Sequence, residues 1–319
     1  MNGESTLKNL KITFLDGKGT LFISDIFILL IVSVLLMTTI ITVMDLSTEK
    51  ILGSLERSNL ERKTVEVLDN LIKNPGTPDN WDHQKNGIDI IPGLGGGNRT
   101  ILFNKLLSLK KSYNRLVDEK IFQDEIKSSI ALSPLDPKVL PIEFGDNEDL
   151  HLVSNVVVVK RLVKCDFLTK FKILDFKEKE RDLCINPNHH GNNWVCEPFT
   201  INKKDLKFTD YYLLFNDGLV GTSNHWSVNN PKNMDENERS IKTNSYRINQ
   251  ILEDQIGNSI QMNFWIHIKL DSNNVNDFDG CLVAIPKDFN MNEILVDGLK
   301  IEYFQYNDCY LTLKTWFKN

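Results

Sequence analysis

One uncharged apolar run constrains this chain more than any other feature. It covers residues 26–44 and contains 19 residues without a single Asp, Glu, Lys or Arg. At about 1.5 Å per residue, an α-helix of this length measures about 28 Å, close to the roughly 30 Å of a bilayer's hydrocarbon core. Backbone groups inside lipid must be satisfied within the segment. The run therefore predicts one membrane-spanning helix.

The charges beside the run predict its orientation. Lys8, Lys11 and Lys18 precede it, whereas Asp45 and Glu49 follow it at once. Lys and Arg are enriched on the cytoplasmic side of membrane helices. We therefore expect a single-pass protein of the cell membrane, with a cytoplasmic N-terminus and an extracellular C-terminal domain.

The residues just before the run suggest how the N-terminus is processed. A secretory signal peptide has a shorter apolar core and a small-x-small cleavage site, and neither is found here. A plain signal anchor accounts for the run. However, Lys18-Gly19 together with Asp25 resembles the class III signal peptides of archaeal type IV pilin-like proteins, in which a prepilin-type peptidase cuts after the glycine. The resemblance implies cleavage between Gly19 and Thr20, with other pilin-like subunits as partners.

Asp25 has two interpretations. An ionisable group near the end of a membrane helix is costly and is usually paired or functional. It is either solvated at the level of the lipid headgroups or paired with the free amine of Thr20 on a neighbouring subunit, which would fix the stagger of packed helices. Asp25 would be sixth in the mature chain, whereas the commoner pilin pattern has Glu at the fifth position.

The second part of the resemblance begins where the helix is expected to end. Pro75-Gly76 stops a helix near Asn74, and Trp81 is expected to dock as an anchor. The order "helix, then PG-x-P-x-x-W" resembles uncharacterised archaeal, largely methanogen, pilin-like surface proteins. The resemblance covers about the first 125 residues, and that family has little assigned function beyond its location.

The rest of the sequence predicts an α+β protein. Its net charge of −6 argues against a nucleic-acid surface. We expect the predicted membrane helix to be followed by a short helical segment and an extracytoplasmic antiparallel β-sandwich-like domain. The predicted divisions are a leader, 1–19; a membrane and stalk helix, 20–74; a turn, Gly-rich loop, helix and Pro-containing connector, 75–150; and the β-rich domain, 151–319.

Two features lie inside the predicted 75–150 segment. The Gly-rich run 93–98 lacks the Gly-Lys-Ser/Thr of a phosphate loop and a helix directly after it, so we expect a flexible loop. Asn98-Arg99-Thr100 is a glycosylation sequon, which makes Asn98 a candidate acceptor in an exported protein. Residues 123–150 contain several prolines and are expected to form the connector.

One strand of the β-rich domain is marked by strict alternation. Phe264, Ile266 and Ile268 should face one side, and Trp265 and His267 the other. The remaining strand candidates are 152–163, 167–176, 211–215, 280–285, 299–304 and 310–317.

The five cysteines suggest disulfides, because exported domains are commonly cross-linked in this way. Cys184 and Cys196 flank a loop and form the favoured pair. Cys281 and Cys309 form a second candidate pair, which leaves Cys165 unpaired as a small buried side chain.

The same loop also invites a zinc interpretation through Cys184, His189, His190 and Cys196. Structural zinc sites usually show two close ligand pairs. The adjacent histidines cannot readily both ligate one ion, and no second close pair exists in the sequence. We therefore expect a solvated loop, with no metal and no cofactor.

The aromatic side chains near Asn-rich segments suggest recognition rather than catalysis. No nucleophile elbow or metal-binding helix pattern surrounds the histidines, so an enzyme is not expected. Aromatic faces beside amides suit sugars and proteins alike, although such residues are often core edges. The candidate ligand surface comprises Trp194, Trp226, Tyr211 and Tyr212.

Two main functions remain open at this point. The first is a minor pilin or pseudopilin that serves adhesion or surface assembly. The second is a stand-alone membrane-tethered module that binds a carbohydrate or protein ligand, with the helix as a tether only. An ectoenzyme is a third and weaker alternative.

Overall fold

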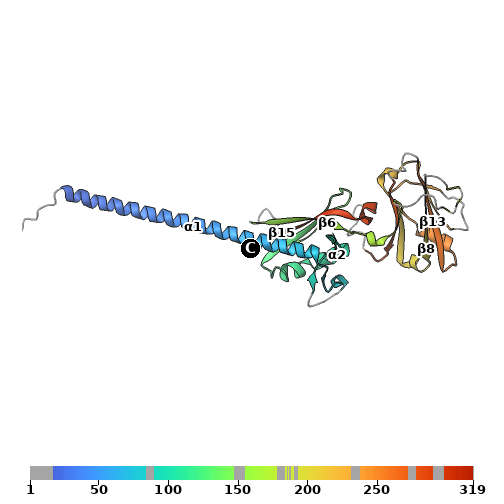
Figure 1. Ribbon diagram of the computed structural model, residues 1–319, viewed down its shortest axis with the longest axis horizontal. Coiled ribbons are helices and arrows are strands. Elements are labelled where there is room, and N and C mark those ends of the chain that lie inside the picture. Colours follow the sequence, from blue (N-terminus) through green and yellow to red (C-terminus); the bar gives the residue numbers. More distant parts are fainter. Residues whose placement is uncertain are drawn as a thin grey trace, which may run out of the picture. The chain divides into compact units, whose positions relative to one another are not determined.

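The computed structural model describes residues 17–83, 90–146, 155–177, 184, 186, 188–189, 193–230, 238–271, 278–289 and 298–318, and for residues 17–24 only the backbone. The chain divides into two units, Met1–Leu60 and Glu61–Asn319, and each is described by itself. A long apolar helix lies near the N-terminus, and a β-rich body with several sheets follows it (Figure 1). The predicted α+β class is confirmed at this level.

The helix is α1, Gly17–Lys73, with 57 residues and no proline. From Asp25 onward it is long and apolar enough to cross a membrane, judged by length and composition. Hydroxyl groups in the apolar part donate back to carbonyls one turn earlier, as Ser33 Oγ does to the Leu29 oxygen at 2.6 Å and Thr42 Oγ1 to the Thr38 oxygen at 2.8 Å. These bonds satisfy the polar groups within the helix, as an apolar environment requires.

A five-stranded sheet forms the first part of the body, in the order β3-β6-β15-β4-β5. β3 runs parallel to β6, and the other neighbours are antiparallel. The last strand of the chain, β15, therefore lies in the middle of a sheet whose other strands come much earlier. The bounds are β3 Thr100–Ile101, β4 Ile126–Pro134, β5 Ile142–Gly145, β6 Val157–Cys165 and β15 Asn307–Phe317.

The last turns of α1 pack against one face of this sheet. Leu311, Leu313 and Thr315 alternate along β15 and are buried. Thr315 Oγ1 lies 2.6 Å from Thr64 Oγ1 of α1, and Leu68, one helical turn further, is fully buried. Buried residues recur at every second position of the strand and about every 3.6 positions of the helix, and both sets pack into one core.

A second contact ties α1 to the neighbouring strand. Arg161 of β6 donates from Nε to Asp69 Oδ1 at 2.9 Å. Arg161 lies on the same side of β6 as the buried Val159 and Val163, two residues before and after it. The polar contact therefore borders the apolar core between helix and sheet.

The Gly-rich run caps the end of α1. The amides of Leu94 and Gly95 donate to the carbonyls of Leu71 at 2.8 Å and Asn74 at 2.9 Å, which satisfies helix-end carbonyls. A Cβ atom on Gly93 would lie 2.3 Å from the Asn74 oxygen. Gly93 and Gly95 are thus explained by close backbone contact with the helix end, and not by the flexible loop that the sequence predicted.

The PG-x-P-x-x-W segment docks beside this cap. Trp81 is buried, as expected of an anchor, and its Nε1 donates to the carbonyls of Pro75 at 3.2 Å and Gly93 at 2.9 Å. Gly76 has φ +92°, and a Cβ there would lie 2.4 Å from Trp81 Cδ1, so only glycine fits. The short elements here are β1 Gly76–Thr77, β2 Ile91–Pro92 and the 3₁₀ helix η1 Trp81–His83.

The expected connector is part of the sheet instead. β4 and β5 both lie within residues 123–150, and both join the sheet that contains β6 and β15. The prolines do not prevent this, because Pro134 ends β4 while Pro137 and Pro141 lie between the two strands. Strands on both sides of the predicted domain start at residue 151 therefore belong to one sheet. The helix expected before the connector is α2 Phe103–Lys111, followed by the π-helix η2 Asn114–Glu119.

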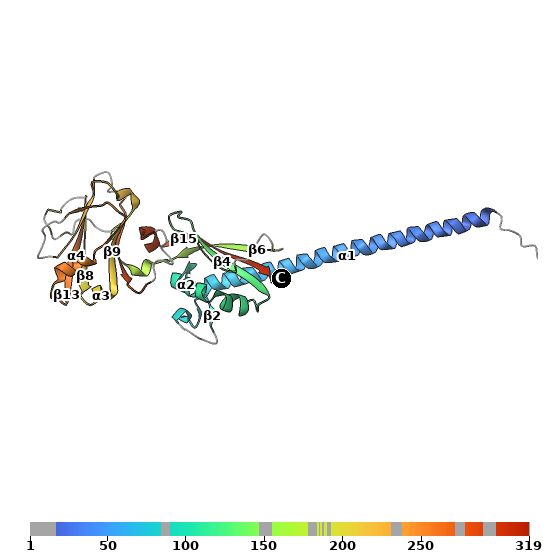
Figure 2. The same ribbon diagram turned by 180° about the vertical axis from the view of Figure 1, so that it is seen from behind.

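Two further antiparallel sheets of four strands share one hydrophobic core with helix α4. The ribbons of these sheets and of the helix can be followed in Figure 2. Their orders are β11-β10-β13-β8 and β12-β9-β14-β7. The strand bounds are β7 Lys172–Asp175, β8 Trp194–Asn202, β9 Thr209–Phe215, β10 His225–Asn229, β11 Arg239–Ser240, β12 Ser245–Arg247, β13 Gln261–Lys269 and β14 Gly280–Pro286. The helices are α3 Asp205–Phe208, α4 Asn249–Ile256, η3 Thr169–Phe171, η4 Asp217–Leu219 and η6 Ile301–Phe304.

The alternation predicted for residues 262–270 is confirmed in β13. Phe264, Ile266 and Ile268 lie in the shared core, whereas Trp265 and His267 alternate with them on the opposite side of the strand. The strand predicted at 299–304 is wrong, because Ile301–Phe304 forms the 3₁₀ helix η6.

The packing of α1 on the sheet gives the first prediction. Leu68→Ala should reduce the free energy of unfolding by about 2–5 kcal/mol, since it leaves a cavity at a fully buried position. The matched control is Leu162→Ala on the exposed side of β6, which should change stability by less than about 0.5 kcal/mol. Chemical denaturation of the full chain in detergent measures both. Equal losses for the two variants would contradict the packing described here.

Candidate functional sites

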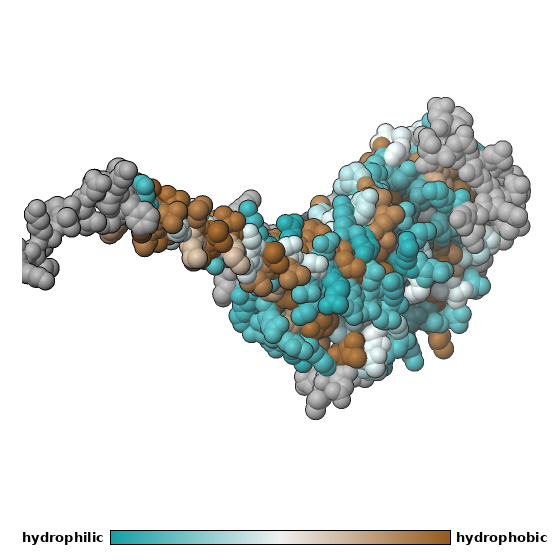
Figure 3. All heavy atoms as spheres, turned by 60° about the vertical axis from the view of Figure 1, so that its left-hand side comes forward, coloured by the Kyte–Doolittle hydropathy of each residue, from teal (hydrophilic) through white to brown (hydrophobic). Residues whose placement is uncertain are grey.

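The apolar part of α1 is the first candidate site. Its large hydrophobic side chains between Ile26 and Met44 are exposed, with Leu29 at 70%. They form the brown stretch of the helix in Figure 3. A continuous exposed apolar surface of this kind is unfavourable in water and marks a membrane or protein contact. Asp25 at its start is exposed as well. Gly19 and Thr20 belong to the described backbone of α1, whereas residues 1–16 of the predicted leader lie outside the described residues.

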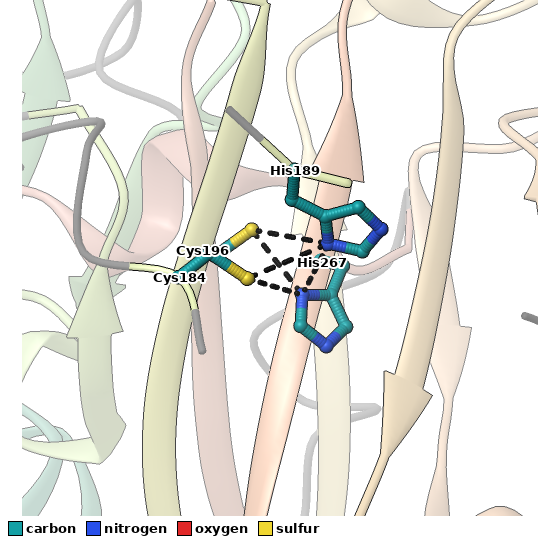
Figure 4. Close-up of side chains that lie close together, drawn as sticks. All are labelled: Cys184, His189, Cys196 and His267. Carbon is teal, nitrogen blue, oxygen red and sulfur yellow. Dashed lines mark hydrogen bonds between the residues drawn. The ribbon is translucent and has the colours of Figure 1, made fainter. Parts of the chain in front are cut away.

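The second candidate site is a cluster of two cysteines and two histidines (Figure 4). Cys196 lies on β8 and His267 on β13, directly opposite each other in the antiparallel pairing. Cys184 and His189 come from the stretch before β8. Their four ligand atoms, two Sγ and two Nδ1, lie within 4.8 Å of one another.

The spacing within the cluster is close and even. The two Nδ1 atoms of His189 and His267 are 3.1 Å apart. Cys184 Sγ is 3.5 Å from each of them. Cys196 Sγ is 3.2 Å from His267 Nδ1 and 3.7 Å from His189 Nδ1. Each sulfur therefore contacts both imidazoles, around one common centre.

The surroundings hold the imidazole of His189 in place. Its ring stacks on Trp194, with ring centroids 3.7 Å apart and an interplanar angle of 12°. The amide of Asn186 lies 3.2 Å from the other ring nitrogen, Nε2. His189, Cys196 and His267 are buried, and Cys184 is half-buried. Such support beyond the ligand atoms fixes the direction in which each ligand points.

The electrostatics of the cluster favour a neutral Cys196 thiol as long as no cation is bound. Burial raises the pKa of the Cys196 thiol, and its contact with the Cys184 thiol raises it further. A divalent cation reverses this preference, because it is the thiolate that coordinates the metal. The cluster is thus a set of soft ligands that can accept a metal ion.

The cysteines do not form the predicted disulfides, because all five are free in the structure. Cys184 and Cys196 contribute their sulfurs to the cluster instead. Cys281 and Cys309 lie in strands of different sheets, β14 and β15. Cys165 is buried, as expected of the unpaired residue.

Sequence reasoning missed His267 as the fourth member of the cluster. His267 is 71 residues from Cys196, and only the pairing of β8 with β13 brings them together. The alternation of β13 already placed His267 away from the core, but nothing in the sequence reveals which residue stands opposite. His190, the other candidate ligand in this stretch of the sequence, lies outside the described residues.

The candidate aromatic surface is not supported by the burial of its members. Trp226 and Tyr211 lie in the hydrophobic core shared by the two four-stranded sheets. Trp194 is buried against His189, and Tyr212 is half-buried. Trp226 and Tyr211 therefore serve as core residues, and Trp194 supports the cluster. By contrast, Asn98 is exposed in a turn with φ 46°, so the sequon is accessible.

A buried carboxyl group forms a third unusual feature. Asp118 lies in the π-helix η2, and Ser128 Oγ donates to its Oδ1 at 2.5 Å. Its Oδ2 is buried without a hydrogen-bond partner among the described residues. Burial raises the pKa of Asp118 to about 6, although the hydrogen bond from Ser128 opposes the shift.

Comparisons of the chain with protein-family models, curated proteins and solved structures found no match.

Asp118 gives a prediction about pH. Because its folded-state pKa is raised from 3.8 to about 6, the folded protein binds more protons than the unfolded chain between these values, and stability falls as pH rises through this window. Asp118→Asn removes the buried charge and should gain up to about 3 kcal/mol over the parent between pH 4 and pH 7.5, since each unit of pKa corresponds to about 1.4 kcal/mol. Asp308→Asn, at an exposed position of β15, is the control and should show no such gain. Parallel pH profiles of the parent and Asp118→Asn would refute the buried-charge account.

Proposed function

We propose that this chain is a membrane-anchored, pilin-like subunit of an archaeal cell-surface system, a minor pilin or pseudopilin. Its N-terminus lies in the cytoplasm and its β-rich body outside the cell. The observation that supports it best is the double character of α1. One part of this helix is uncharged and exposes apolar side chains, while its last turns are buried against the five-stranded sheet.

This double character favours a subunit over a tethered module. A helix that serves only as a tether needs no contact with the domain it carries, since a linker is sufficient. Here Leu68, Leu71 and Ile72 belong to the core of the body, and the Gly-rich run caps the helix end. The resemblance of Lys18-Gly19 and Asp25 to class III signal peptides supports the same proposal.

The remaining sheets suggest what the body contributes. The two four-stranded sheets with a common core form a sandwich-like module between β6 and β15 in the chain. In such modules the loops between strands carry binding surfaces. Under this proposal the module provides the contacts for adhesion or for control of assembly, and no catalytic activity is assigned to it.

The first test is the N-terminus of the protein extracted from native membranes. The proposal predicts a mature chain that begins at Thr20, because a prepilin-type peptidase cuts after Gly19 and leaves the apolar helix intact. Gly19→Val should block this cut, whereas Gly17→Val should not. N-terminal sequencing or mass spectrometry measures each product. A parent chain that still begins at Met1 would favour the tethered binding module.

The second test concerns Asp25. Pairing of its carboxylate with the amine of Thr20 on a neighbouring subunit requires the charge, so Asp25→Ala should abolish co-assembly but leave membrane insertion unchanged. Asp45→Ala, at the other end of the apolar run, serves as the control. Cross-linking in membranes followed by gel analysis measures the assemblies. Survival of assembly in Asp25→Ala would show that the pairing is wrong.

A further inference from the structure

We propose that Cys184, His189, Cys196 and His267 form a structural Zn²⁺ site. Thiolate and imidazole are the preferred ligands of zinc, and Cys₂His₂ is one of its common structural sets. The proposal does not depend on the pilin-like function, because it rests on the geometry of this cluster alone. It replaces both the disulfide and the solvated loop expected from the sequence.

The distances fit a tetrahedron around one zinc ion. With Zn–S bonds of about 2.3 Å and Zn–N bonds of about 2.0–2.1 Å, two nitrogens should be about 3.3 Å apart and a sulfur and a nitrogen about 3.5 Å apart. The nitrogen pair of His189 and His267 is 3.1 Å apart. The four sulfur–nitrogen distances lie between 3.2 and 3.7 Å.

The arrangement favours zinc over other metals. A [2Fe–2S] centre with two cysteines and two histidines keeps the thiolates on one iron and the imidazoles on the other. Here each sulfur contacts both imidazoles, so all four ligand atoms share one centre. Magnesium and calcium require oxygen ligands, and blue-copper sites use a single cysteine. Tetrahedral coordination of one ion by two cysteine sulfurs and two histidine nitrogens is typical of zinc.

The site is structural because its coordination would be complete. A catalytic zinc keeps an open position for water or substrate, whereas four protein ligands close the sphere. Burial of both imidazoles and the stacking of Trp194 on His189 agree with a closed site.

The ion would hold the stretch before β8 against the sheet. Cys196 and His267 lie on the side of β8 and β13 that faces away from the shared hydrophobic core. Cys184 and His189 precede β8 and approach the same side. Four bonds to one ion would therefore fix a segment that has no strand pairing of its own among the described residues.

Metal analysis of the full chain, purified in detergent under reducing conditions, tests the proposal. Elemental mass spectrometry should find about one zinc per chain, because the site holds one ion. Cys184→Ser and His267→Asn should lower this to less than about 0.1. Cys281→Ser and His225→Asn are the matched controls outside the cluster and should retain the zinc. Cys184 is the preferred position, since it is half-buried and lies outside the strands.

A second measurement uses the parent chain alone, so that an unfolded variant cannot obscure the result. After zinc is removed with a chelator, added Co²⁺ should give the intense visible bands of tetrahedral thiolate–cobalt coordination. Proteolysis on the N-terminal side of Trp194 should become faster on chelation and slow again when Zn²⁺ is restored. A reduced parent chain without zinc and without cobalt bands would overturn the proposal. So would full zinc content in Cys184→Ser, or a Cys184–Cys196 disulfide in protein purified without oxygen.

Discussion

The contact between the last turns of α1 and the five-stranded sheet is the interaction on which the body depends. Thr64 and Thr315 meet in its core although 251 residues separate them in the chain. Because β15 lies between β6 and β4, the sheet is complete only when the C-terminal strand is in place. Contacts of such long sequence separation slow folding. We therefore expect the five-stranded sheet to be completed late in folding, after the strands between β6 and β15 have formed.

The parts of the fold that could be predicted are those whose signal is local. The apolar run of α1, the anchoring Trp81 and the alternation of β13 each depend on neighbouring residues, and each agrees with the described structure at the level of helix, burial and strand face. The strands β4 and β5 were missed because they join a sheet completed by β15, at the far end of the chain. Gly93 and Gly95 suggested flexibility because the backbone that they contact belongs to another segment.

The Cys and His cluster shows the same limit at the level of a site. Cys184, His189 and Cys196 are close in the sequence, and their spacing alone fits a disulfide loop as well as a metal site. Only the register of β8 and β13 adds His267 and turns three residues into a tetrahedral set. A metal ion in this place would also keep two neighbouring thiols from oxidising to a disulfide, since both sulfurs would be coordinated.

The central claim is that the apolar part of α1 lies in the membrane while the β-rich body lies outside the cell. Protease added to intact cells, followed by carbonate washing of the membranes, tests this claim most directly. The account predicts that the body is degraded while a fragment containing residues 26–44 remains in the washed membranes. A body that survives the protease until the cells are lysed, or a fragment released by carbonate, would contradict it.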